Sequence, residues 1–158
     1  MHNMRWRNAL RMSAWLVLAA VISGCGDSTS EPETSVTIND LVGSWIATSA
    51  VFTNKTNSAQ TFDIVASGGE LRVTVLQSGG ARTWLTIGSF EDEWDSSLKI
   101  VGTQLTSTPA EATRPTRHYT VAMSAGELTL TSGDANFDFT LSGAAGVAAN
   151  EVVTFVRN

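Results

Sequence analysis

Few residues in this 158-residue chain could carry out acid–base or nucleophilic chemistry. The two histidines are His2 and His118, and Cys25 is the only cysteine. A serine nucleophile needs an adjacent base, and His118, beside Tyr119, is the candidate in the body of the sequence. No Gly-x-Ser-x-Gly segment is present to expose such a serine. We therefore predict no catalytic residue and no enzymatic activity, with His118 on the surface or in a wall of the fold.

The densest charge run, Glu91-Asp92-Glu93-Trp94-Asp95, is the segment that offers most carboxylates to a cation. It lacks the Asp-x-Asp-x-Asp-Gly spacing of a calcium loop. A single cysteine also excludes an internal disulfide and a zinc site built from several cysteines. We predict no metal site and no cofactor. The run is interpreted as a solvated connection between two strands, with Trp94 folded back onto the domain.

Cys25 follows a segment that is typical of protein export. Arginines at positions 5, 7 and 11 precede an apolar run from 14 to 22, which is shorter than the roughly 20 residues that cross a bilayer as a helix. The run ends in Ile22-Ser23-Gly24-Cys25, which resembles the bacterial lipobox. That resemblance implies that residues 1–24 are removed as a signal peptide and that lipid on Cys25 holds the protein on a membrane. An ordinary signal peptide with a coincidental cysteine is the alternative.

The residue after Cys25 and the charge of the mature chain bear on location and partners. In enteric bacteria, aspartate after the lipidated cysteine retains a lipoprotein at the inner membrane, so Gly26 implies the outer membrane, facing the periplasm. Without residues 1–24 the chain carries 7 basic against 15 acidic residues, a net charge of −8. Such a surface repels nucleic acid and anionic headgroups. We therefore expect no nucleic-acid partner, and membrane contact through the lipid on Cys25 alone.

Residues 25–37 are rich in serine, threonine, glutamate and proline. They cannot bury enough apolar surface to offset their ordering entropy, which predicts a flexible tether. The folded domain is predicted over 38–158, a length typical of one domain. It opens with one capped helical turn over residues 39–42.

The pattern after this turn is β almost throughout. Runs rich in valine, isoleucine, threonine, leucine and aromatic residues predict strands, and the segments between them contain turn residues. The predicted strands are 44–53, 61–65, 70–77, 82–88, 98–106, 117–124, 127–131 and 152–157, with a short ninth at 136–141. The predicted turns are Gly68-Gly69, Gly79-Gly80, Ala125-Gly126 and Ser132-Gly133-Asp134.

About eight successive antiparallel strands without covering helices must protect their edges. An up-and-down barrel does so completely, because its last strand pairs with its first. The sequence therefore predicts an all-β fold of this kind. A β-sandwich is the alternative architecture.

The start of the first predicted strand carries a recognisable motif, Leu41-Val42-Gly43-Ser44-Trp45. A helical turn followed by Gly-x-Trp resembles the lipocalins, especially the short bacterial lipocalin-like domains, which also end on a strand with a late arginine. Here that arginine is Arg157. The resemblance implies a calycin-type barrel in which Trp45 plugs the closed end and Arg157 lies across its ring.

A barrel of this size is either packed solid or holds one small ligand. The first hypothesis is a monomeric module that binds a small hydrophobic molecule such as a fatty acid. Its predicted ligand-binding wall consists of Phe62, Leu71, Val73, Trp84, Leu98, Ile100 and Tyr119. The alternative is a non-enzymatic interaction or inhibitor protein, in which a solid barrel offers its acidic exterior to a basic partner.

Overall fold

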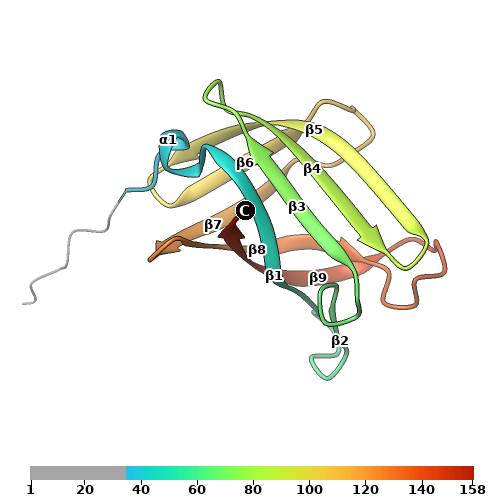
Figure 1. Ribbon diagram of the computed structural model, residues 1–158. Helices are drawn as coiled ribbons and strands as arrows, with labels where there is room; N and C mark the ends of the chain where they lie inside the picture. The colour runs from blue at the N-terminus through green and yellow to red at the C-terminus, as the bar shows by residue number, and fades with distance from the viewer. Residues whose placement is uncertain (1–34) are drawn as a thin grey trace, which may run out of the picture. The chain divides into compact units, whose positions relative to one another are not determined.

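The computed structural model describes residues 35–158 (Figure 1). The predicted signal peptide, Cys25 and most of the predicted tether lie outside the described residues. The described chain forms one short helix and nine strands: α1 (Ile38–Leu41), β1 (Gly43–Asn54), β2 (Thr61–Asp63), β3 (Glu70–Val75), β4 (Gly80–Ile87), β5 (Phe90–Val101), β6 (Gln104–Pro109), β7 (Arg117–Ser124), β8 (Glu127–Phe137) and β9 (Val147–Arg157).

The strands form one antiparallel sheet that closes on itself. β1 is followed by β3 to β9 in chain order, and β9 pairs back with β1. Eight strands make the closed cycle, while the three-residue β2 pairs only with β1. In Figure 1, β3, β4 and β5 form the upper wall and β7, β8 and β9 the lower wall. The predicted eight-stranded up-and-down barrel is confirmed, and the alternative of a sandwich is wrong because the sheet has no break.

β1 is shared by three partners. Its first residues pair with β3, its later residues pair with β2, and its other edge pairs with β9. A register shift between Ala47 and Ser49 interrupts the ladder with β9, as at a β-bulge. The Asp63 carboxylate accepts hydrogen bonds from the Ser49 hydroxyl at 3.0 Å and the Ala50 amide at 3.1 Å. Asp63 thus binds β1 along the stretch that β3 no longer covers.

The predicted strand over 98–106 is wrong, because the segment forms two strands. β5 ends at Val101 and β6 begins at Gln104. Gly102 lies between them with φ +62°, a backbone conformation that glycine adopts without steric cost. Residues typical of strands lie on both sides of this turn, so the sequence pattern did not indicate it.

The acidic run 91–95 is also corrected, from a connection to a strand. It belongs to β5, which starts at Phe90. Its residues alternate: Asp92 and Trp94 face the barrel interior. The other three residues, Glu91, Glu93 and Asp95, are exposed. The outward Asp95 pairs with Arg82 of β4 at 2.8 Å. The neighbouring strand therefore supplies a positive charge beside this acidic run.

The predicted turn at 132–134 and the separate short strand at 136–141 are parts of one strand and its following loop. β8 runs from Glu127 to Phe137, with a register shift between Ser132 and Ala135. The bulge absorbs the glycine and aspartate that resembled a turn. β9 likewise begins at Val147 rather than at 152, so the end of the small-residue segment 143–149 is strand.

The packed domain begins two residues before the predicted boundary at 38. Val36 is 7% exposed and belongs to the core. The amide and hydroxyl of Thr37 both donate to the Asp40 carboxylate, at 2.8 and 2.6 Å, which caps the start of α1. Within residues 35–158, no helix combines the length and the apolar character needed to span a bilayer.

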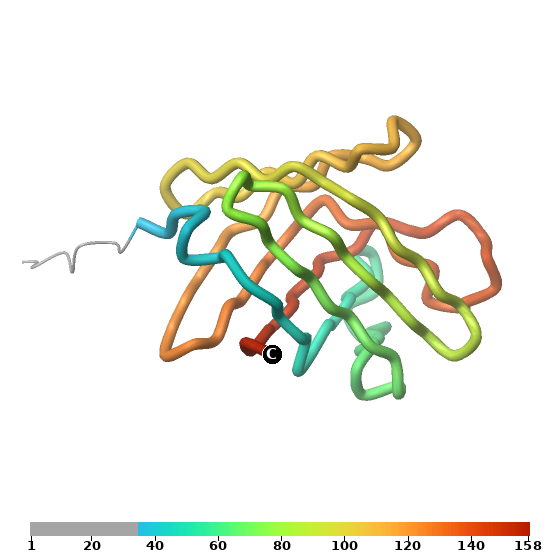
Figure 2. The backbone as a smooth tube through the Cα atoms, turned by 45° about the horizontal axis from the view of Figure 1, so that its top comes forward, coloured from blue at the N-terminus to red at the C-terminus, as the bar shows by residue number. Residues whose placement is uncertain are grey.

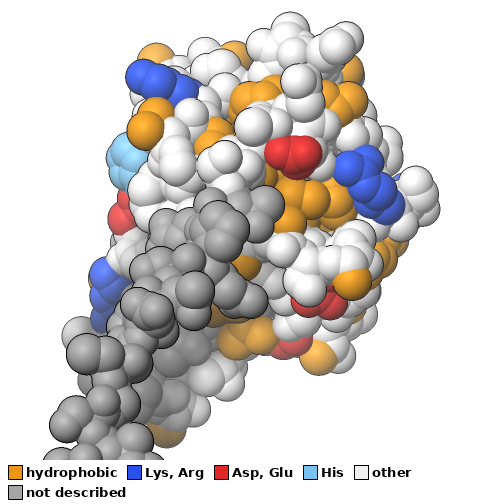
Figure 3. All heavy atoms as spheres, turned by 90° about the vertical axis from the view of Figure 1, so that its left-hand side faces the viewer, with side chains coloured by type: hydrophobic (Ala, Val, Ile, Leu, Met, Phe, Trp, Pro, Cys, Tyr) orange, Lys and Arg blue, Asp and Glu red, His pale blue; other side chains and the backbone are white. Residues whose placement is uncertain are grey.

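The two ends of the barrel differ (Figure 2). α1 and the turns β3–β4, β5–β6 and β7–β8 lie at one end, called the closed end below. The connections β4–β5, β6–β7 (residues 110–116) and β8–β9 (residues 138–146) lie at the other, the open end. Figure 3 looks onto the side that carries α1, where hydrophobic side chains show between polar ones.

Candidate functional site

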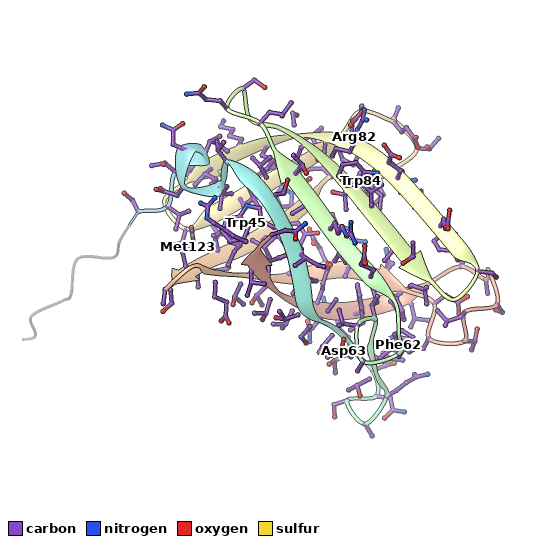
Figure 4. All side chains as sticks on the ribbon, viewed as in Figure 1. Trp45, Phe62, Asp63, Arg82, Trp84 and Met123 are labelled. Atoms are coloured by element: carbon purple, nitrogen blue, oxygen red, sulfur yellow. The ribbon has the colours of Figure 1, made fainter. Side chains whose placement is uncertain are left out.

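The closed end is sealed by Trp45, labelled in Figure 4, and by Arg157, which the structure places on the face of the Trp45 ring. Trp45 is 1% exposed, and its indole Nε1 donates to the Leu41 carbonyl at 2.7 Å. The guanidinium carbon of Arg157 lies 4.4 Å from the centre of the Trp45 ring. The same guanidinium donates to the carbonyls of Val42 and Asp40, both at 2.8 Å. Arg157 therefore joins the end of β9 to α1 across the tryptophan face.

Gly43 of the Gly-x-Trp motif makes this closure possible. Its φ is +131°, and a Cβ built on it would lie 2.8 Å from Nη1 of Arg157. Any side chain at this position would strain the backbone and displace the guanidinium. The motif therefore has a direct structural role in closing the barrel.

The barrel interior holds a cavity of about 370 Å³ above this seal. The cavity is surrounded mainly by apolar side chains, including Leu41 from α1 and Phe155 from β9. Ligand pockets in proteins span about 300–1,000 Å³, so this cavity is at the small end of that range. The interior is not filled by its own side chains, which removes the packing on which the solid-barrel alternative was based.

Four of the seven residues predicted as cavity wall line the cavity. They are Leu71, Val73, Leu98 and Tyr119. Ile100 shares the inward face of β5 with Leu98 but packs against the core without lining the cavity. Phe62 packs against the core from β2, with its ring centre 5.3 Å from that of Phe137, and does not line the cavity either.

The prediction that Trp84 lines the wall is wrong. Its neighbours Thr83 and Leu85 line the cavity, so alternation along β4 directs Trp84 outward. Across the sheet, Trp84 is in register with Arg72 of β3 and Glu93 of β5. Register decides the face of a strand residue, and a large aromatic side chain does not by itself identify the inner face.

A polar cluster interrupts the apolar wall on β7 and β9. Arg117 Nη1 donates to the Glu151 carboxylate at 3.1 Å. Glu151 is 7% exposed, and burial raises its pKa while the Arg117 guanidinium opposes that shift. Burial, aided by the Glu151 charge, also raises the pKa of the neighbouring Tyr119 hydroxyl, which therefore stays protonated. These three side chains all line the cavity.

A second ion pair lies toward the open end. Arg114, in the β6–β7 connection, donates two hydrogen bonds to the Asp92 carboxylate of β5, at 2.6 and 2.9 Å. Its guanidinium carbon lies 4.9 Å from the centre of the Trp94 ring, and Nε bonds Glu111 at 3.0 Å. The hydrogen bonds with Asp92 raise the pKa of Arg114. Arg114 thus fastens its connection to the rim of β5.

Aromatic rings gather at the same end of the barrel. Phe52 and Phe137 stack with ring centres 4.2 Å apart, and Phe139 meets Phe137 edge-on at 5.1 Å. Phe90 lines the cavity and is 56% exposed. An exposed aromatic side chain that also lines a cavity marks its opening, so Phe90 gives the cavity an apolar rim.

The residues first considered for chemistry do not converge. His118 is exposed, and its Nδ1 lies 3.3 Å from the Thr106 hydroxyl. It does not line the cavity, whereas Arg117 and Tyr119 on either side of it do. Across residues 35–158, no group of three or more histidine, cysteine, aspartate or glutamate side chains is placed to hold a metal ion.

Sequence reasoning missed the charged residues of the cavity: Asp92, Arg114, Arg117 and Glu151. A signal for two of them was present. Arg117 has the same alternation parity as Tyr119, and Glu151 the same parity as Val153 and Phe155, so each lies on an inward face. Glu151 precedes the last predicted strand, 152–157, and charged residues are rarely buried unless they are paired.

Comparisons with protein-family models, curated proteins and solved structures find no match to this chain. The function is therefore inferred from the cavity, its lining residues and the sequence motifs.

Proposed function

We propose that this protein is a lipid-anchored lipoprotein of the bacterial cell envelope whose lipocalin-like barrel binds a small hydrophobic ligand. The observation that carries the proposal is the 370 Å³ cavity inside a closed barrel. Its walls are mainly apolar, with a few convergent polar groups, as in small-molecule sites. Each 100 Å² of apolar ligand surface that enters contributes roughly 2.5 kcal/mol.

The lipocalin-like assignment is supported by the closed end. The helical turn, Gly43-x-Trp45 and Arg157 are the features on which the resemblance depends, and the contacts of Arg157 with the Trp45 ring and two carbonyls fit the expected seal. A seal at one end and loops at the other leave the cavity one natural opening, beside Phe90.

A fluorescent ligand tests binding directly. The uncharged probe N-phenyl-1-naphthylamine should brighten on binding the purified protein and should quench Trp94, which lines the cavity. Val73→Phe fills part of the cavity and should weaken probe binding at least tenfold. Val101→Phe makes the same change on a 66% exposed residue of β5 and should leave binding unchanged.

Two outcomes would contradict the binding function. One is a wild-type protein that does not bind the probe, and the other is equal binding by Val73→Phe and wild type. Absence of binding would favour the alternative of an interaction protein with an acidic exterior.

The anchor is tested separately in cells. We expect the protein in the outer-membrane fraction and facing the periplasm, because of Cys25 and Gly26. Globomycin, which blocks lipoprotein signal peptidase, should cause the precursor to accumulate, and Cys25→Ser should release the domain from the membrane. Processing that is insensitive to globomycin would contradict lipidation at Cys25.

A further inference from the structure

We infer that the cavity selects hydrophobic molecules with an uncharged polar group, such as a hydroxyl, carbonyl or amide, over carboxylates and amines of equal length. This inference rests on the proposed ligand-binding function and names the chemical class of the ligand. The charges and hydrogen-bonding groups that line the cavity carry it.

The charged side chains that line the cavity are two cations and two anions, and they are already paired with each other. Arg117 pairs with Glu151 at 3.1 Å, and Arg114 pairs with Asp92 at 2.6 Å. The lining therefore has no net charge and no unpaired cation or anion for an ionised ligand.

Burial makes these pairs costly to disrupt. The side chains of Arg117 and Glu151 are 25% and 9% exposed, and those of Arg114 and Asp92 are 29% and 24% exposed. A ligand carboxylate that paired with Arg117 would leave Glu151 buried without a partner. A ligand amine that paired with Glu151 would likewise leave Arg117 buried without a partner. Removing one partner from a buried ion pair is strongly unfavourable.

Uncharged hydrogen-bonding groups line the cavity as well. Ser96, Ser107, Tyr119 and Asn136 offer hydroxyl and amide groups that both donate and accept hydrogen bonds. They can bind a ligand hydroxyl or carbonyl without separating either ion pair. The deeper lining, which includes Leu128, Val153 and Phe155, is apolar and accommodates a hydrocarbon portion.

Three ligands of equal length test the inference: 1-decanol, decanoate and decylamine, each used to displace N-phenyl-1-naphthylamine from the full mature protein. Decanol should displace the probe at a concentration at least tenfold lower than either ion. Equal or stronger displacement by decanoate or decylamine would overturn the inference while leaving the binding function intact. Failure of the probe itself to bind would overturn both.

A variant separates recognition from the greater hydrophobicity of an alcohol. Glu151→Gln leaves Arg117 without an anionic partner, so the affinity for decanoate relative to decanol should rise at least tenfold. Asp92→Asn repeats the test at Arg114, near the open end, where Glu111 still pairs with the guanidinium and the rise should therefore be smaller. The control is Asp95→Asn, which breaks the outward pair with Arg82 and should leave the ratio unchanged. An unchanged ratio in both cavity variants would overturn the inference.

Discussion

Arg157 combines a cation–π contact with two hydrogen bonds to backbone carbonyls, and all three contacts join different parts of the closed end. The guanidinium covers the Trp45 ring and donates to the carbonyl of Asp40, within α1, and to that of Val42, directly after it. Arginine suits this position because its planar group can lie on an aromatic face and donate in its own plane at the same time.

At the scale of the residue, Arg157→Ala should therefore destabilise the barrel by about 1–2 kcal/mol, through loss of the cation–π contact and both hydrogen bonds. Urea unfolding followed by tryptophan fluorescence measures this loss. Arg82→Ala is the matched control, because Arg82 pairs with Asp95 on the exposed outer surface and such pairs contribute little. Equal losses in the two variants would contradict a special role for Arg157.

The position of a single residue could be predicted where its amino-acid type decides the face on which it lies. It could not be predicted where only the pairing register of the strand decides that face. Leu71 and Val73 were predicted correctly as cavity lining because strict alternation with Arg72 fixes the face of β3. The prediction for Trp84 was wrong because tryptophan and the adjacent leucine are both apolar. The sequence pattern alone does not decide which of the two faces the interior. Glu151 was missed because only the partner Arg117, from another strand, makes its burial tolerable.

Among the elements, two hairpin turns that contain a glycine at positive φ were predicted from the sequence. Gly79 and Gly126 have φ of +83° and +86° and lie in hairpin connections that the sequence indicated. The β5–β6 hairpin was missed because Gly102 is an isolated turn residue in a segment, 98–106, that is otherwise typical of a strand. The bulge in β8 was not predictable for the opposite reason, since its residues are typical of a turn.

The β8–β9 connection is organised by Asp138. Its carboxylate accepts hydrogen bonds from the hydroxyl and amide of Thr140 and from the amides of Ser142, Gly143 and Ala144. These bonds, chiefly those from Thr140, lower the pKa of Asp138 to about 2, against an ordinary value of 3.8. The ionised form is therefore the one that holds this connection at the open end.

Because the folded state lowers this pKa, the stabilisation by Asp138 is complete above pH 3.8 and disappears as the pH falls through about 2. Asp138→Asn should lower the free energy of unfolding at pH 5, and its difference from wild type should shrink steadily toward pH 2. Thr140→Ala should show a smaller effect of the same form. A difference that does not vary with pH would contradict this role.

For the molecule as a whole, strand pairing is extensive on one side of the barrel and short on the other, which is called the weak side below. β8 pairs with β9 from Glu127 to Phe137, interrupted only by the bulge between Ser132 and Ala135, and β9 continues the sheet by pairing with β1. β6 and β7 are in register only from Gln104 to Ser107. Beyond that point, the ion pair between Arg114 and Asp92 holds the β6–β7 connection against β5.

Hydrogen exchange should reveal this asymmetry. Backbone amides of residues 104–107 and 117–120 should exchange at least tenfold faster than those of β8 and β9, because local opening needs less free energy where fewer ladder bonds must break. Mass spectrometry of peptic peptides measures the rates, and a saturating ligand should slow exchange at the weak side. Uniform protection around the barrel would contradict the prediction.

The seam between β1 and β9 has a consequence for how the chain is made. Trp45 is in register with Arg157, so β1 cannot complete its pairing until β9 is present. The closed barrel cannot form before β9 has been synthesised, and pairings between residues so distant in the chain form slowly. Strands β1 to β8 can therefore pair with their neighbours during synthesis, but the edge of β1 stays unpaired until β9 emerges.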